Sequence, residues 1–148
     1  MEELLELKTF IELGNYDRAL NLIGEMEEMS RDDKISKIFS YAEILLIHLI
    51  KQHAEKRSTR SWNASVRNSV YKINYINKRR KAGGYYLAED ELKEVMSDAW
   101  PLALLRASFE AFEGRFDDRE LAEKVNEEEI KKEALKLILE ARDQKKRN

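Results

Sequence analysis

The chain has 148 residues, of which 38% are charged, and a formal net charge of −2 at pH 7. This length suits one domain whose core needs no cross-links. The absence of cysteine excludes disulfides, thiolate metal sites and cysteine nucleophiles, and it fits a reducing cytoplasm. The longest apolar run, residues 44–50, is far too short to span a membrane, and no targeting segment opens the chain. We therefore expect one cytoplasmic domain, residues 1–148, without membrane association.

The scarcity of helix-breaking residues predicts an all-α fold. One proline and five glycines leave most of the chain free to form helix. Residues 1–29 predict an N-terminal helical hairpin, in which Gly14 ends the first helix in a C′-type position. Asn15 can then cap the second helix, because its side-chain oxygen can accept a hydrogen bond from the first helical turn.

Residues 30–114 predict the core of an up-and-down helical bundle. Its first helix should begin near residues 30–33 and run to about His53, with apolar residues at i, i+3, i+4 and i+7 spacing. Between Ile44 and Ile50 this helix is apolar on nearly every side except at His48. A helix that is hydrophobic all round belongs at the centre of a bundle.

Two further helices complete the predicted core. Ser61 is a plausible cap for the first of them, and Gly83-Gly84 should end it. The second opens with the acidic residues 89–91, which suit the positive end of the helix dipole. Pro101 removes a backbone donor, so a kink or a break is expected in the turn before it.

Residues 115–148 predict a charged C-terminal extension that ends in a peripheral helix. From Asn126 onward the apolar residues recur on one face of a strongly charged helix. A single apolar face needs a covering surface, which either the bundle or a second subunit can supply. Both coverings remain open at the level of the sequence.

Charge is segregated along the chain. Residues 1–33 carry ten acidic and three basic side chains, whereas residues 51–81 carry ten basic side chains and one acidic one, Glu55. Such segregation indicates either neighbouring helices that attract one another or a basic face for an acidic partner. Intramolecular matching is the simpler interpretation.

A candidate polar site is predicted where the two central helices join. It consists of His48, Arg57, Arg60, Trp62 and Arg67. In one interpretation His48 is a neutral core histidine and Trp62 is a core anchor. In the other, the arginines form an anion-binding cluster beside His48, since guanidinium groups suit phosphate and carboxylate.

The basic stretch also contains a candidate patch for nucleic acid. The patch consists of Lys72, Lys78, Arg79, Arg80 and Lys81, with Tyr71 and Tyr75 interleaved. It could bind backbone phosphates with strong salt dependence and little sequence preference. The competing interpretation is an ordinary solvated face matched to the acidic N-terminal segment.

No motif identifies an enzyme, a metal site or a cofactor. His48 and His53 are five residues apart and so do not share a helix face as metal ligands would. No glycine-rich phosphate loop follows a strand pattern. Small helical ribonucleases use an arginine a few residues before a histidine, and neither histidine here has one. We expect no metal and no cofactor, and the chain leans away from being an enzyme.

The order of these residues resembles the domain-of-unknown-function 29 family of bacterial helical proteins. The resemblance is carried by His48-Leu49-Ile50-Lys51, Arg57, Arg60, Ser61-Trp62, Val66 and Arg67, and by the upstream stretch GNYDRALNLIGEMEEMSRDDKISKIF. It covers roughly residues 5–115 and implies a compact all-α bundle with no established activity. The charged helix after Asn126 departs from the tail common in the family.

Together these features predict a helical interaction module that binds a protein partner or associates with itself. The apolar face of the tail and the segregated charge favour this interpretation. The alternative is a nucleic-acid-binding or RNA-processing protein that uses His48 with Arg57, Arg60 and Arg67.

Overall fold

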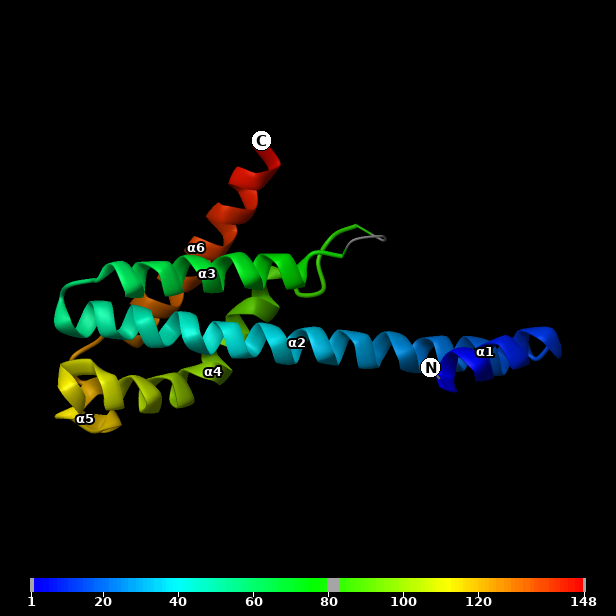
Figure 1. The fold of residues 1–148 in the computed structure, drawn as a ribbon, viewed down its shortest axis with the longest axis horizontal. Helices are drawn as coiled ribbons and strands as arrows, with labels where there is room; N and C mark the ends of the chain where they lie inside the picture. The colour runs from blue at the N-terminus through cyan, green and yellow to red at the C-terminus, as the bar shows by residue number, and fades with distance from the viewer. Residues whose placement is uncertain (1, 80–82, 148) are drawn as a thin grey trace. The chain divides into compact units, whose positions relative to one another are not determined.

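The computed structural model describes residues 2–79 and 83–147, with side chains up to residue 144 (Figure 1). Within this part of the chain there are six α-helices, one short 3-10 helix and no strand. These are α1 (Glu2–Glu12), α2 (Tyr16–Glu55), α3 (Arg60–Asn77), α4 (Glu89–Glu110), η1 (Ala111–Gly114), α5 (Asp118–Ala122) and α6 (Glu127–Arg147). The predicted all-α class is confirmed. The chain forms two compact units, residues 1–35 and residues 36–148, and none of its described helices is long and apolar enough to cross a membrane.

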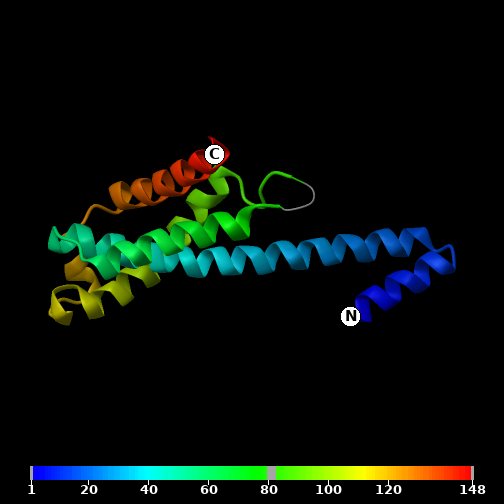
Figure 2. The ribbon, with the colours of Figure 1, turned by 45° about the horizontal axis from the view of Figure 1, so that its top comes forward.

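The first unit is a helical hairpin made of α1 and the first turns of α2 (Figure 2). Gly14 closes α1 with a φ of +74°. Its N–H donates to the carbonyl of Ile11 at 3.1 Å, and the N–H of Asn15 donates to the carbonyl of Phe10 at 2.8 Å. This pair of bonds is the Schellman motif, which favours glycine because the C′ residue is left-handed. The predicted hairpin and the role of Gly14 are confirmed.

One long helix, α2, replaces the two helices predicted on either side of residue 30. Ser30 and Asp33 are exposed and helical, where the sequence predicted the start of a new helix. No glycine or proline occurs between residues 25 and 55, so nothing removes a backbone hydrogen bond or favours a turn. The predicted boundary was wrong, since polar residues that suit a cap also tolerate the solvated face of a continuous helix.

The second unit is a helical bundle whose core lies between the later turns of α2 and the helices α3 to α6. Its largest fully buried side chains are Ile38, Leu45, Leu46, Leu49, Ile50, Ile73, Leu87, Leu92, Met96, Leu121, Ile130 and Ile138. Burial of each such side chain contributes about 2 kcal/mol of transfer free energy. The tail helix α6 packs on α3 and α4 with Ile130, Ala134 and Ile138 fully buried. The bundle therefore covers the apolar face of the tail.

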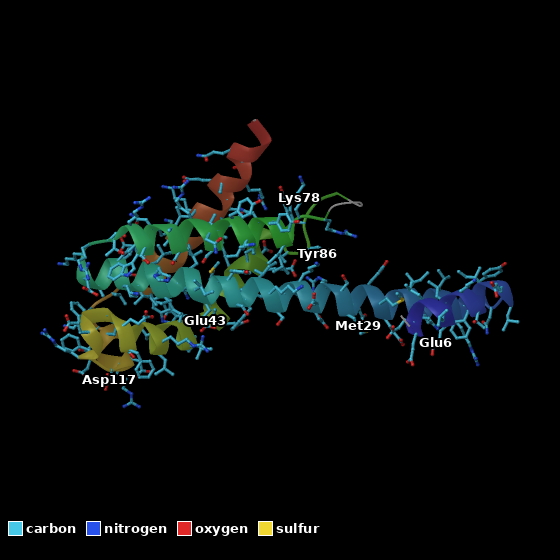
Figure 3. The ribbon with its side chains drawn as sticks, in the orientation of Figure 1. Glu6, Met29, Glu43, Lys78, Tyr86 and Asp117 are labelled. Carbon is cyan, nitrogen blue, oxygen red and sulfur yellow. The ribbon has the colours of Figure 1, made fainter. Side chains whose placement is uncertain are left out.

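An ion pair between a buried carboxylate and an exposed guanidinium joins α2 to α4. Glu43 is nearly buried, and its Oε1 lies 2.9 Å from Nη1 of Arg106 (Figure 3). The contact lacks hydrogen-bond alignment, so Coulombic attraction holds the pair. Glu43 stands on the same central helix as the fully buried leucines, where an unpaired carboxylate would be costly.

A threonine, rather than the predicted serine, caps α3. The N–H of Trp62 donates to Oγ1 of Thr59 at 3.0 Å, and Thr59 has the extended backbone of an N-cap residue. Ser61 instead lies in the first turn of the helix. The predicted start was therefore two residues late.

The end of α3 is fixed by a buried asparagine. Asn77 is fully buried, and its amide forms two bonds with one residue. Nδ2 donates to the carbonyl of Leu87 at 3.2 Å, and Oδ1 accepts from the N–H of Leu87 at 2.8 Å. The amide of Asn77 thus satisfies both backbone groups of Leu87 and holds the loop that follows α3 against the end of the helix. The helix ends at Asn77 rather than at the predicted Gly83-Gly84.

Pro101 bends α4 without breaking it. Helical structure continues from Glu89 to Glu110, while Figures 1 and 2 show the two parts of α4 running in different directions. Proline is an ordinary cause of such a kink, since it removes one bond and displaces one carbonyl. Pro101 is exposed, so water can solvate the freed carbonyl.

After α4 the chain reverses in a left-handed turn. Phe112, Glu113 and Gly114 have φ angles of 53°, 58° and 78°. A carboxylate of α2 holds this turn, because Oε2 of Glu55 accepts from the N–H of Phe112 at 3.2 Å. Asp117 then caps α5, accepting from the N–H of Glu120 at 2.8 Å (Figure 3). This short helix was not predicted.

Candidate functional site

A groove of about 550 Å³ lies between α3 and α6 in the second unit. Its apolar lining comes from Val66 and Val70 on α3 and from Leu137 and Ala141 on α6. Three cations line it, from both helices and from the loop after α3, namely Arg67, Lys78 and Arg142. Among the described lining residues the one carboxylate is Glu140. The groove thus combines apolar surface with an excess of positive charge.

Two buried polar atoms on the groove residues lack a hydrogen-bond partner in the described part of the chain. They are Oδ1 of Asn74 and Nε of Arg142. The other amide atom of Asn74 is satisfied, since Nδ2 donates to the carbonyl of Ile138 at 3.0 Å. A buried donor and a buried acceptor left open cost free energy. Because both atoms are shielded from solvent, a ligand would reach them only after the side chains around them moved.

Tyrosines form the aromatic part of the groove. Tyr71 and Tyr75 stand one turn apart on α3 and stack with ring centroids 6.2 Å apart and planes 20° from parallel. Cζ of Arg142 lies 4.4 Å from the ring centroid of Tyr85. Tyr85 thereby fixes the guanidinium plane by a cation–π contact.

The predicted polar site is divided by the structure. Arg57 and Trp62 come together, with Cζ of the arginine 4.6 Å from the centroid of the indole ring. Arg60 is exposed at the first residue of α3. Arg67 lines the groove, whose lining contains neither His48 nor Trp62. Of the five residues, Arg67 is the one that lines this groove.

Lys51, which the sequence analysis did not include in the candidate polar site, also lies beside Trp62. Its ammonium lies 4.6 Å from the centroid of the indole ring and 3.3 Å from Oε1 of Glu110. Only 6% of the side chain of Lys51 is exposed, so ring and carboxylate replace much of its water. Trp62 is half-buried between Lys51 and Arg57, and the tryptophan buried in the core is Trp100.

His48 is half-buried in the described fold, not enclosed in the core as predicted. Its Nδ1 is buried and has no hydrogen-bond partner among the described residues. Burial lowers the pKa of His48, the positive charge of Lys51 lowers it further, and the carboxylate of Glu110 opposes the shift. The histidine is therefore biased toward its neutral form.

The other histidine belongs to a helix–helix contact. Nε2 of His53 lies 2.5 Å from Oε2 of Glu133 on α6. Three metal-ligating side chains do not converge anywhere in residues 2–79 and 83–144. The contact joins the end of α2 to the tail helix.

The candidate basic patch is only partly within the described residues. Lys78 and Arg79 are exposed, and Lys72 is half-buried. Cζ of Arg79 lies 5.9 Å from the ring centroid of Tyr86. Arg80 and Lys81 lie outside the described residues. Of the patch, Lys78 belongs to the groove lining.

Sequence reasoning missed Asn74, Glu140 and Arg142. A signal existed for one wall, since the lining residues Arg67, Tyr71, Asn74 and Lys78 recur at i, i+4, i+7 and i+11 on α3. No comparable signal existed for Arg142, because its position depends on how α6 packs against α3.

These features define an all-α bundle protein with a basic groove built on its tail helix. Residues 12–126 match the family model described as "Domain of unknown function DUF29". The chain belongs to this family, which confirms the resemblance expected from the sequence. No curated protein and no solved structure matches the chain. The matched range includes α3 and ends before α6, so one wall of the groove lies outside it.

Proposed function

We propose that the protein is a helical interaction module that binds an acidic helical segment of a protein in the groove between α3 and α6. The observation that carries the proposal is the groove itself, in which the exposed cations Arg67 and Lys78 lie beside an apolar wall. Guanidinium groups bind carboxylates through charge-assisted hydrogen bonds. The apolar wall then favours a segment with leucine-like side chains on the same face.

The elongated lining and the chemistry of the groove favour a helix face as its occupant. Its apolar and aromatic lining on α3 runs from Val66 to Tyr75, about two and a half turns of the helix. A helix laid in such a groove presents anchors at i, i+4 and i+7.

A direct test measures the affinity of a labelled amphipathic peptide built from glutamate, leucine and alanine, by fluorescence anisotropy. The control peptide carries lysine at each glutamate position. We expect binding of the acidic peptide only, weakened by salt. The double variant R67E/K78E should bind it at least about tenfold more weakly, a change of about 1.4 kcal/mol.

A matched variant separates the groove from net charge. K132E/R119E makes the same change of charge at exposed positions outside the groove lining, and it should bind the acidic peptide like the unaltered chain. Equal affinity for both peptides, or no loss in R67E/K78E, contradicts the proposal. Labelled single-stranded RNA is the third probe, and RNA bound more tightly than the acidic peptide would favour the nucleic-acid alternative instead.

A further inference from the structure

The hairpin of the first unit presents a cluster of strongly exposed apolar side chains at its turn. Leu13, Tyr16 and Leu20 are 77%, 64% and 66% exposed. Tyr16 and Leu20 stand one turn apart on the same face of α2, and Leu13 lies in the turn just before it. We call these three residues, with their exposed acidic neighbours Glu12 and Asp17, the hairpin tip. An exposed apolar cluster of this kind marks an interaction surface.

The charge around the hairpin tip restricts what can cover it. Residues 1–33 carry ten acidic and three basic side chains. Two hairpin tips brought face to face would repel each other, because like charges would be desolvated together. Lys8 and Arg18 offset part of the acidic charge at the tip itself, but the whole segment stays acidic, so a surface that is both apolar and basic complements it best.

The groove between α3 and α6 has that composition. It offers Val66, Val70 and Leu137 for apolar contact, and Arg67 and Lys78 for carboxylates. Both cations are exposed and so can reach acidic side chains of an incoming segment. The hairpin tip is an acidic helical segment with anchors at i and i+4, which is the ligand chemistry proposed above for the groove.

We propose that the hairpin tip of one copy of this chain docks in the groove of a second copy. The inference rests on the proposed function and names the partner. Each copy carries one hairpin tip and one groove, so two copies that exchange tips reciprocally form a closed, two-fold symmetric dimer. Because charge complementarity drives the contact, association strengthens with protein concentration and weakens with salt.

The test uses the full chain, with mass measured by light scattering over a range of concentrations at low and high salt. The tip variant is E12K/D17K, and the groove variant is R67E/K78E. All four positions are exposed, so both variants should keep the helical circular dichroism of the unaltered chain. We expect the unaltered chain to dimerise and each variant alone to be monomeric.

The decisive measurement is the mass of an equimolar mixture of the tip variant and the groove variant. The basic tip of one variant then faces the acidic groove of the other, and the unaltered tip faces the unaltered groove, so both contacts are restored. We expect the mixture to regain the dimer mass. The control variants E27K/E28K and K132E/R119E match the changes in charge at exposed positions outside the tip and the groove and should dimerise normally.

Two results would overturn the inference. One is an unaltered chain that stays monomeric at high concentration and low salt. The other is a dimer whose mass is unchanged in both variants. If the chain is monomeric but its groove still binds the acidic peptide, the proposed function stands and only the second copy as partner is rejected.

Discussion

The ammonium of Lys51 lies 4.6 Å from the centroid of the Trp62 ring, on a side chain that is almost entirely buried. Arg57 contacts the same ring at the same distance, but 54% of its side chain is exposed. One indole therefore carries a desolvated cation and a solvated one. The two contacts on one ring thus differ strongly in the exposure of the cation.

A double-mutant cycle should reveal that difference. We expect a coupling free energy of about 1–2 kcal/mol between K51M and W62L, because the buried ammonium has lost most of its water. The cycle between R57M and W62L should give about 0.5 kcal/mol, as at exposed sites. Urea unfolding followed by circular dichroism measures both. Equal couplings would show that burial does not govern the contact.

The lowered pKa of His48 predicts a pH dependence of stability. Burial is the main cause of the shift and the charge of Lys51 adds to it. The unfolded chain binds a proton as the pH falls through about 6.5, whereas the folded chain resists protonation until lower pH. The free energy of unfolding should therefore fall as the pH drops from about 6.5 through the folded pKa of His48.

H48Q is the variant that tests this dependence. The difference in unfolding free energy between the unaltered chain and H48Q should change across that pH range and stay constant above it. The ring protons of His48 in NMR spectra should titrate with a midpoint below 6.5, and K51M should move it upward. A midpoint at or above 6.5 in the unaltered chain contradicts the argument.

Asn77 is expected to be the most sensitive polar residue of α3. N77A leaves the buried N–H and carbonyl of Leu87 without partners, so the loss should be about 2–4 kcal/mol. N68A, an exposed position on the same helix, should change stability by no more than about 0.5 kcal/mol. Urea unfolding compares the two, and similar effects would mean that the Asn77 bonds contribute little.

Two glycines should respond to alanine in opposite directions. At Gly114, φ is +78° and an added Cβ would lie 3.1 Å from the carbonyl oxygen of Phe109, so G114A should lose about 1–2 kcal/mol or more. Gly24 is helical with nothing within 4 Å of an added Cβ, so G24A should gain about 0.5–1 kcal/mol. Thermal unfolding measures both, and a stabilising G114A would contradict the turn geometry.

Local chemistry explains which parts of the fold the sequence predicted. Gly14 and Asn126 act within a few residues of themselves: the first closes α1, and the second caps α6 by accepting from the N–H of Glu129 at 3.0 Å. The predicted helix boundary near Ser30 was wrong because it rested on local capping preference alone. A cap residue is a local preference, and the continuous backbone of α2 satisfies more hydrogen bonds than two shorter helices would.

The candidate site shows the limit of sequence spacing. Arg57 and Trp62 lie together in the structure, because they flank a short connection between two helices. The sequence analysis placed Arg67 in the same candidate site. Arg67 lies five residues beyond Trp62 on α3, about 500° around the helix axis, so the two side chains leave the helix on different faces. Arg67 therefore lines the groove instead.

The sequence by itself determined the helical class, the hairpin turn, the charge asymmetry and the family, because these depend on composition and on residues close together in the chain. Only the tertiary structure decided that α6 lies against α3, which brings Arg142 to Asn74 and Lys78 and creates the basic groove. The physical reason is that helix packing depends on how the side chains of two surfaces fit together. These surfaces come from distant parts of the chain: Asn74 donates to the carbonyl of Ile138, which lies 64 residues away in the sequence. No periodicity within one helix records that contact.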